Sequence, residues 1–574
     1  MKKNILLITS LLFGASSSAQ QGISLPRFSP PMDIPLNLAG NFMELRSDHF
    51  HSGLDLKTEG REGIPVKAAG DGWISRIKIS PWGYGKAVYV DHPNGFTTVY
   101  GHLSSLEGSV GKAALDAQYK ARSFDVDVTF DRGEVPVSQG QVIAKSGNTG
   151  GSSAPHLHFE VRRTSDQHAL DPESYGMDVD DTVFPTITGL RIDPLDSLAR
   201  NSPYPEKAKG FAVTASNDST YAVKAGLLPA AFGTVGLSVN VIDRYNGNWN
   251  TCGIRSLAVS VDGTPVWSAT LDEIDFGLQR YADAYMDYRL FKNGDLHYNR
   301  CYKLPNNKLA LYGKEPAQGR IAVTPGKDHA VQVVATDANG NKSTLTFVLR
   351  GATAEEAAKW RAPVQSGELF RYDKENTLTR DGLRFTLPPN ALYTNERLGY
   401  IKSPAPKTTW APVHRLHDPL TPLHLAGELS IEVPKPPPAA LASKLLIVKL
   451  DEKGRPTAIG GTYADGWVTT KVKAFGKYTV MLDTVAPVLT PLNIKPSMKG
   501  QASFSLRVGD NLSGLDQWSA KLDGEWILLE YEPKSRILKH TFDAHSSAAG
   551  EHTLVVEVRD DRGNRTTLTR TFTR

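Results

Sequence analysis

The sequence predicts a mainly β protein in which a compact antiparallel β domain is followed by immunoglobulin-like β-sandwich domains. Short apolar runs alternate with polar residues across residues 46–178, and glycine-containing turns separate the runs. A set of sequence landmarks from the second quarter of the chain returns near its end, as expected for two copies of one fold. A length of 574 residues exceeds what a single core supports, so several domains are expected.

The first domain, residues 46–178, is expected to contain at least six strands. Turn signals such as Asp71-Gly72 and Pro93-Asn94-Gly95 separate its apolar runs. The predicted strands are Pro65–Ala69, Gly72–Ile79, Ala87–Asp91, Phe96–Tyr100, Val142–Lys145 and His156–Arg162.

The N-terminus has the order of a secretory signal. Lys2 and Lys3 precede an apolar run over residues 5–13, and small residues follow up to Ala19. The apolar run is too short to span a bilayer. We therefore expect a signal peptide at residues 1–19 and an extended lead-in at 20–45. The mature chain is expected to have no transmembrane span and to be exported to the periplasm or cell envelope.

An internal repeat predicts the later domain boundaries. The segment Asp181-Thr182-Val183-Phe184-Pro185 returns as Asp483-Thr484-Val485-Ala486-Pro487, and a later Asp-x-x-Gly-Asn turn is also shared. Immunoglobulin-like sandwiches are therefore expected at 181–351 and 483–574, with a β-rich domain of unknown type at 352–482. The first copy carries an insertion near 268–318. Such sandwiches would position the first domain or bind a protein partner in the cell envelope.

The chain has two cysteines, Cys252 and Cys301. In an exported protein such a pair is permitted to form a disulfide, which here would fasten the insertion to its sandwich. Two buried free thiols are the alternative. Two cysteines are too few for a cysteine-rich zinc site.

The charge balance gives no reason to expect a nucleic-acid partner. The formal net charge is +4, and no long basic run is present. We therefore predict no nucleic-acid binding.

Plausible metal ligands gather only in the first domain. If residues 155–161 form a strand, His156, His158 and Glu160 share one face, because side chains alternate along a strand. Two further candidates, His51 and Asp55, lie four residues apart. Together with His102, these residues offer three ligands for a hydrolytic zinc ion and two spare imidazoles for proton transfer.

These motifs resemble the lysostaphin-type (LytM-like) zinc endopeptidases, whose marks are H-x-x-x-D and a later H-x-H. The neighbouring segments Tyr100-Gly101-His102 and Ser146-Gly147-Asn148-Thr149-Gly150 also match. The resemblance covers residues 40–175. It implies one zinc ion held by His51, Asp55 and His158, with His102 and His156 as the catalytic pair. It also implies cleavage of peptide bonds in bacterial peptidoglycan.

Two readings of another class remain. One is a catalytically silent scaffold that binds cell wall or a partner hydrolase, and the other is a lipoyl- or biotinyl-like carrier domain. Neither needs three ligands together with two spare histidines.

Several nearby residues have open roles. Arg46 is expected to meet either a substrate carboxylate or a structural ion pair, and Glu160 to be solvated or salt-bridged rather than catalytic. His49 is expected to be structural. Residues 111–133 are interpreted as an insertion that walls or caps the substrate groove.

Overall fold

The computed structural model describes residues 25–201, 210–294, 296–360 and 366–574. The predicted signal peptide at 1–19 lies outside these residues. The described residues are mainly β, which confirms the predicted fold class. Within them, no helix combines the length and apolarity needed to cross a membrane.

The N-terminal domain is built on one antiparallel sheet with the strand order β1-β2-β11-β6-β5-β4-β8. All the pairings along this order are antiparallel, as predicted. A small second sheet has the order β3-β10-β7. The elements are β1 (Leu38–Gly40), β2 (Leu54–Lys57), β3 (Pro65–Lys67), β4 (Gly72–Ile79), β5 (Lys86–Asp91), β6 (Phe96–Leu103), β7 (Ser105–Leu106), α1 (Gly108–Ala121), β8 (Val126–Thr129), β9 (Pro136–Val137), β10 (Val142–Lys145), β11 (His156–Arg163), β12 (Ala169–Leu170) and η1 (Pro172–Tyr175).

Strand β11 shows why the sheet forms here. Leu157, Phe159 and Val161 are fully buried on one side of it, as the alternation predicts. The lead-in is more than an extended tail, because β1 pairs with β2 and Phe28 joins the buried core.

The segment predicted as an insertion forms helix α1 and strand β8. Helix α1 buries Val110, Ala114 and Gln118, which are spaced four apart and so share one face. The helix ends where Arg122 adopts a left-handed conformation with φ 49°.

The next unit is an eleven-stranded sheet system that continues the core of the first domain. One hydrophobic cluster runs through both units, and β20 of the insertion pairs with β12 of the first domain. The elements are β13 (Thr186–Pro194), β14 (Arg200–Asn201), β15 (Phe211–Ala215), β16 (Thr220–Val223), β17 (Ala230–Ile242), β18 (Ser256–Val261), β19 (Thr264–Thr270), β20 (Glu273–Ile274), η2 (Phe276–Tyr281), α2 (Ala282–Tyr285), α3 (Tyr288–Gly294), β21 (Tyr298–Arg300), β22 (Ile321–Val323), β23 (Asp328–Thr336) and β24 (Lys342–Gly351).

Of the two states that the sequence allows for the cysteines, the structure has the second: Cys252 and Cys301 are both buried free thiols. Cys252 pairs with Asp243, just beyond the end of β17, whereas the Cys301 amide donates to the Leu237 carbonyl within that strand. These pairing positions are about 20 Å apart at the rise of a β-strand. A disulfide needs Cα atoms within about 7 Å, so the two thiols cannot meet.

Two five-stranded sheets form the third unit, which also contains a two-stranded pair. It begins after α4 (Ala354–Ala358), whose capping box joins Thr353 and Glu356. The strands are β25 (Glu368–Phe370), β26 (Asn376–Arg380), β27 (Leu383–Leu387), β28 (Glu396–Leu398), β29 (Tyr400–Ser403), β30 (Val413–Leu416), β31 (Pro422–Glu432), β32 (Leu445–Leu450), β33 (Pro456–Gly460), β34 (Thr462–Ala464), β35 (Trp467–Ala474) and β36 (Gly476–Leu482), with η3 at Ala439–Lys444.

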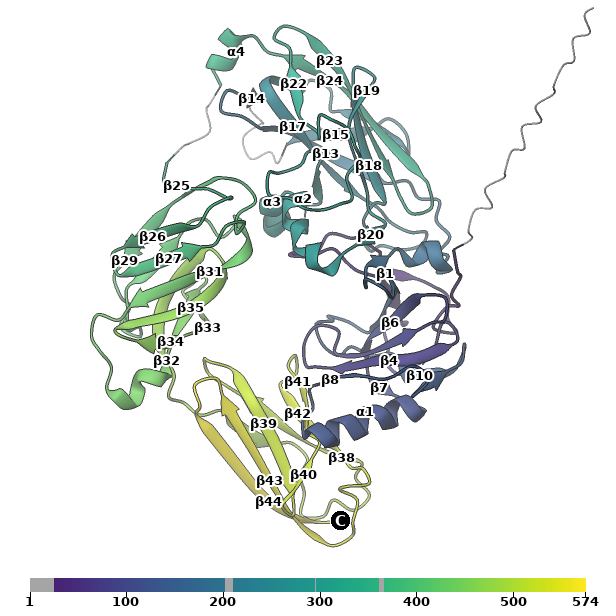
Figure 1. The fold of residues 1–574 in the computed structure, drawn as a ribbon, viewed down its shortest axis with the longest axis vertical. Coiled ribbons are helices and arrows are strands. Elements are labelled where there is room, and N and C mark those ends of the chain that lie inside the picture. Colours follow the sequence, from purple (N-terminus) through teal and green to yellow (C-terminus); the bar gives the residue numbers. More distant parts are fainter. Residues whose placement is uncertain (1–24, 202–209, 295, 361–365) are drawn as a thin grey trace, which may run out of the picture.

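The last unit packs two four-stranded sheets around one core. Its strands are β37 (Val488–Pro491), β38 (Ser503–Gly509), β39 (Leu515–Leu522), β40 (Glu525–Ile527), β41 (Glu530–Glu532), β42 (Ile537–Thr541), β43 (Glu551–Asp560) and β44 (Arg565–Thr573). The four units follow one another around a ring, so the yellow C-terminal unit lies beside α1 of the purple N-terminal domain (Figure 1).

Tyr119 of α1 makes one of the contacts that close the ring, beside the Lys86–Glu530 ion pair at 2.8 Å. The Tyr119 hydroxyl donates to Asp543 at 2.6 Å, and its ring stacks on His545 with a centroid separation of 3.9 Å. The same ring meets Trp526 edge-on at 5.1 Å.

We expect Tyr119→Ala to weaken this contact by about 2 kcal/mol, the sum of two aromatic contacts and one hydrogen bond. Hydrogen exchange of residues 108–121 should accelerate, and Tyr119→Phe, which keeps the ring, should show a smaller change. Lys112→Ala, an exposed change on the same helix, is the control. Unchanged exchange in Tyr119→Ala would show that the contact does not hold the ring closed.

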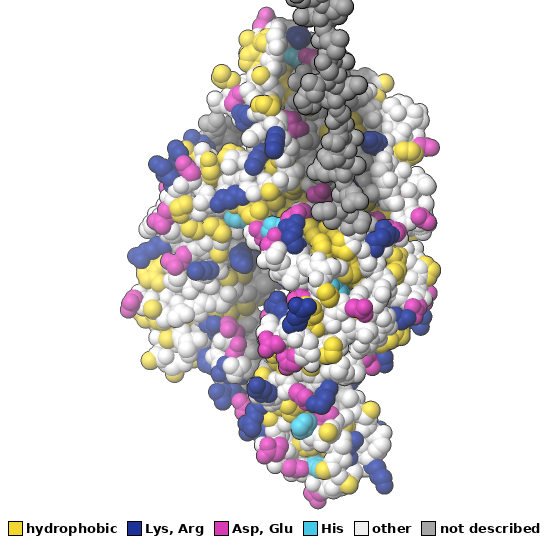
Figure 2. Space-filling view, turned by 45° about the vertical axis from the view of Figure 1, so that its right-hand side comes forward, with side chains coloured by type: hydrophobic (Ala, Val, Ile, Leu, Met, Phe, Trp, Pro, Cys, Tyr) yellow, Lys and Arg dark blue, Asp and Glu magenta, His cyan; other side chains and the backbone are white. Residues whose placement is uncertain are grey.

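One face of the molecule shows no large patch of a single charge among its described residues (Figure 2). Figure 2 shows basic and acidic side chains interspersed over the visible face. This distribution agrees with the near-neutral formal charge.

Candidate metal centre and groove

Three adjacent strands carry the predicted site residues. Strand β11 lies between β2 and β6, and its register places His158 opposite both Asp55 and Gly101. His102 follows Gly101 directly, and His51 lies just before β2. Sheet pairing therefore brings together residues that are about a hundred positions apart in sequence.

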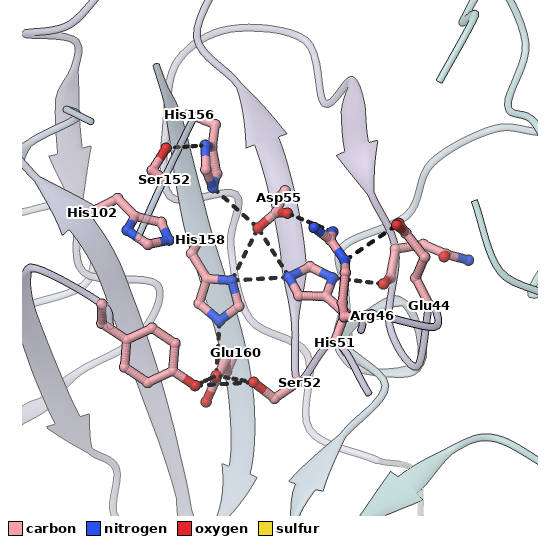
Figure 3. Close-up of polar contacts among 12 residues, drawn as sticks. Glu44, Arg46, His51, Ser52, Asp55, His102, Ser152, His156, His158 and Glu160 are labelled. Atoms are coloured by element: carbon pink, nitrogen blue, oxygen red, sulfur yellow. Dashed lines mark hydrogen bonds and ion pairs between the residues drawn. The ribbon is translucent and has the colours of Figure 1, made fainter. Parts of the chain in front are cut away.

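His51, Asp55 and His158 converge on one point. The Nε2 atom of His51 and the Nδ1 atom of His158 each lie 3.0 Å from Asp55 Oδ1. The two nitrogens are also 3.0 Å apart. All three residues are buried, and Figure 3 shows their side chains pointing toward one another. This is the ligand set that the sequence predicts.

Hydrogen bonds fix the orientation of both imidazoles. His51 Nδ1 is 2.7 Å from the Asn41 carbonyl oxygen, and His158 Nε2 is 2.8 Å from Glu160 Oε1. Because each outer nitrogen donates to its oxygen, each inner nitrogen carries a lone pair toward the centre. This tautomeric arrangement fits a metal ion.

The electrostatic environment favours a positive charge at the same point. Burial lowers the pKa of His51 to about 4. Burial also opposes protonation of His158, but the Asp55 and Glu160 carboxylates outweigh it and raise the pKa of His158 to about 9. A metal cation bound between these groups would neutralise the carboxylate charge that a proton on His158 otherwise neutralises.

A buried network of hydrogen bonds and ion pairs surrounds Glu160, the residue that contacts His158. Glu160 is fully buried and accepts hydrogen bonds from Ser52 at 2.6 Å and Tyr84 at 2.5 Å. Arg162 donates to its other oxygen at 2.6 Å. Burial favours the protonated acid, but Arg162 and His158 hold the pKa of Glu160 well below its usual range. Glu160 is thus ion-paired, the second of the two expected roles, and it is not solvated.

Arg46 forms a structural ion pair, which is one of its two predicted roles. Its guanidinium lies 3.0 Å from Asp55 Oδ2 and 3.2 Å from Glu44 Oε1. The contact occupies the outer oxygen of Asp55 and leaves Oδ1 for the centre. Sequence reasoning missed Glu44, Ser52 and Tyr84, since only the folded chain brings them to the site.

His102 and His156 lie beside the three converging residues. Their ring centroids are 4.8 Å apart, and the His102 centroid is 5.9 Å from that of His158. His102 Nδ1 is 2.8 Å from the Thr149 carbonyl oxygen. His156 Nδ1 is 2.9 Å from the Ala154 carbonyl, and its Nε2 lies 3.2 Å from Asp55 Oδ1.

The backbone and burial of His102 are unusual. It adopts φ 60°, a left-handed conformation that is rare for a non-glycine residue. Burial and the neighbouring His158 and His156 lower the pKa of His102 to about 3. The ring is therefore held neutral.

An open groove of about 1330 Å³ runs past these five residues. One wall comes from the N-terminal domain and includes Trp82 and Arg162. The other comes from the first sandwich unit and includes Trp249, Phe276 and Arg280. The wall predicted at 111–133 lies elsewhere, because α1 faces the C-terminal unit and does not line the groove. A different insertion, near 268–318, supplies the part of the wall that contains Phe276 and Arg280.

Other histidines lie outside the centre. His49 is exposed at the groove rim, where its Nδ1 lies 2.7 Å from Asp48. His92 is buried between the Asp71 carbonyl and Thr98.

Comparison with known proteins agrees with this geometry. Residues 49–118 and 127–172 match peptidase family M23, and residues 367–483 match a Zu5-like domain. The chain carries a peptidase family M23 domain. The resemblance to lysostaphin-type enzymes is thereby confirmed, and this family comprises zinc metallopeptidases.

Curated relatives share this part of the chain. The "DD-carboxypeptidase/endopeptidase Mpg" of Neisseria meningitidis is 35% identical over 118 residues, which are 21% of each chain. The "Murein hydrolase activator EnvC" of Escherichia coli is 33% identical over 116 residues, 20% of this M23-containing chain and 21% of that protein. The chain thus spans about a fifth of the length of each relative. The solved catalytic domain of lysostaphin from Staphylococcus simulans is 28% identical, with a TM-score of 0.17, over 23% of this chain and 85% of that one.

Proposed function

We propose that the protein is an exported zinc metalloendopeptidase that hydrolyses peptide bonds in bacterial peptidoglycan. The observation that carries this proposal is the convergence of His51, Asp55 and His158 beside two further histidines and an open groove. Relatives named as peptidoglycan endopeptidases support the substrate class.

Zinc fits the donor set. His51 Nε2, Asp55 Oδ1 and His158 Nδ1 would hold one ion, and two nitrogens with one carboxylate oxygen are common ligands of hydrolytic zinc. When bound, zinc supplies Lewis acidity, which polarises a carbonyl group and lowers the pKa of water.

The two remaining histidines handle protons. With its Nδ1 hydrogen donated to Thr149, His102 presents an unprotonated Nε2 that can accept a proton from attacking water. His156 is the more exposed of the two and lines the groove. Its Nδ1 already faces the Ala154 carbonyl, so it is in the doubly protonated form that its Nε2 can donate a hydrogen bond to the developing oxyanion. The groove walls bind and orient the peptide.

Purified peptidoglycan incubated with the zinc-loaded protein tests the proposal. We expect new amino termini from a single type of peptide bond, identified by mass spectrometry of the released fragments. Intact glycan-linked peptides after prolonged incubation would refute the proposed activity.

A non-catalytic role in hydrolase activation is the second candidate, because one relative is named as an activator. The chain has all three candidate ligands and both further histidines, which favours catalysis over activation. Stimulation of a separate hydrolase by a protein that neither binds zinc nor cleaves peptides would support the activator role.

Glu160 is expected to tune metal affinity through His158. In Glu160→Gln the amide is a weaker acceptor for His158 Nε2, so zinc affinity should fall about 10- to 100-fold. Competition with a chromophoric zinc chelator measures this change. Glu62→Gln, an exposed substitution in the same domain, is the control and should leave affinity unchanged.

A further inference from the structure

Two clusters of three aspartates occupy equivalent places in the two copies of the repeat. One consists of Asp181, Asp243 and Asp337, and the other of Asp483, Asp510 and Asp560. In each cluster, one carboxylate oxygen per residue lies within 4.8 Å of the others. Neither cluster belongs to the proposed active site.

The first cluster holds carboxylate oxygens without partners. Asp243 is 1% exposed, and neither of its carboxylate oxygens has a hydrogen-bond partner. Asp181 is 7% exposed, and its Oδ2 atom is also unpartnered. Among the described residues, no Lys or Arg nitrogen lies within 4.0 Å of a carboxylate oxygen of the three. Buried carboxylates in this condition are either protonated or bound to a cation.

Electrostatics agrees with the geometry. Burial and the nearby Asp337 and Asp181 carboxylates raise the pKa of Asp243 to about 8. A cation would relieve the same repulsion, because it attracts all three carboxylates together.

The second copy repeats the asparagine contacts, although its carboxylates have more partners, since Asp510 Oδ2 accepts from the Leu512 and Gly514 amides. The Asn341 side chain donates to Asp337 Oδ2 at 2.8 Å and to the Asp181 carbonyl at 3.2 Å. Asn564 makes the matching bonds to Asp560 Oδ2 at 2.7 Å and the Asp483 carbonyl at 3.2 Å. Asp510, like its counterpart Asp243, has an unpartnered buried oxygen.

We propose that each cluster binds one divalent cation, and that the cation is Ca²⁺. All the donors are oxygens, which hard cations prefer, and neither histidine nor cysteine belongs to either cluster. Ca²⁺ tolerates irregular oxygen sites and fills its remaining positions with water or carbonyl groups, whereas Mg²⁺ demands near-octahedral geometry.

Each site lies where a sandwich meets the domain before it. The loop that follows Asp243 carries Asn248, which accepts a hydrogen bond from Lys57 of the N-terminal domain at 2.6 Å. The loop that follows Asp560 carries Arg562, which donates to the Leu445 and Gly461 carbonyls of the third unit. Calcium would therefore hold the loops that join neighbouring units.

Calcium titration of the zinc-loaded, calcium-depleted protein tests the inference. We expect two Ca²⁺ per chain by isothermal titration calorimetry, and a rise in Tm of about 5 °C in excess Ca²⁺. Asp243→Asn and Asp510→Asn should each bind one Ca²⁺, and the double variant none. Asp218→Asn, an exposed change in the first sandwich unit, should bind two.

The variants also distinguish a cation site from a purely structural role. Asparagine keeps the shape of aspartate and removes an uncompensated buried charge, so Asp243→Asn should be at least as stable as the parent in a chelator. In excess Ca²⁺, the parent should instead be more stable than Asp243→Asn. No heat and no Tm shift in the parent protein would overturn the inference, as would two Ca²⁺ bound by the double variant. An equal response to Mg²⁺ would overturn the assignment to calcium.

Discussion

Replacing His51 with alanine is expected to remove bound zinc and to lower peptidoglycan cleavage by at least about 10³-fold. The substitution deletes one of three donor atoms that lie 3.0 Å apart, and it leaves Asp55 and His158 unable to close the site alone. Zinc per chain is measured by inductively coupled plasma mass spectrometry, and cleavage by the release of peptide fragments.

The matched control is His49→Ala, two positions away in the same segment. The His49 side chain is exposed and pairs with its neighbour Asp48, so zinc content should match that of the parent. Full zinc content in His51→Ala would show that the ligand assignment is wrong. Full activity with zinc absent would instead show that cleavage does not need the ion.

The local sequence pattern predicted β11 well, because its polar and apolar side chains alternate with period two, although residues on both of its faces are buried. In β11, Leu157, Phe159 and Val161 are buried by the core, and His156 and His158 face the site, as the alternation requires. The choice of His51, Asp55 and His158 as candidate ligands came from the resemblance to lysostaphin-type enzymes, since residue types and spacing alone gave a larger set of candidates.

Long-range packing was not predictable. The groove wall around Phe276 and Arg280 reaches the site only because β20 pairs with β12, roughly a hundred residues earlier in the chain. The state of the two cysteines was decided by packing for a similar reason, since they lie beside different positions along β17 and remain free thiols. The two roles left open for Arg46 were decided by the fold, which places its guanidinium against Asp55.

The resulting architecture has a consequence for substrate binding. The N-terminal domain and the first sandwich unit share one hydrophobic core, and each contributes one wall of the groove. Under the proposed function, this unit would form part of the substrate-binding site, and we expect the walls to keep their spacing during catalysis.

Replacing His102 or His156 with alanine is expected to separate metal binding from catalysis. Neither residue belongs to the converging triad, so each variant should keep one zinc per chain. Peptide cleavage should nevertheless fall by about 10²- to 10⁴-fold, the usual contribution of a positioned general acid or base. The loss should appear in kcat more than in KM, since these groups act on the reacting atoms rather than on the distant peptide.

The two variants also test which imidazole serves as the base. His102 is held neutral by burial and by the neighbouring His158 and His156, and its Nδ1 hydrogen is directed at the Thr149 carbonyl, so His102→Ala removes the proton acceptor at Nε2. A small nucleophile that needs no deprotonation, such as hydroxylamine, should restore part of its activity and should not rescue His156→Ala. Loss of zinc in both variants would instead place these histidines among the ligands. Rescue of His156→Ala alone would exchange the two roles.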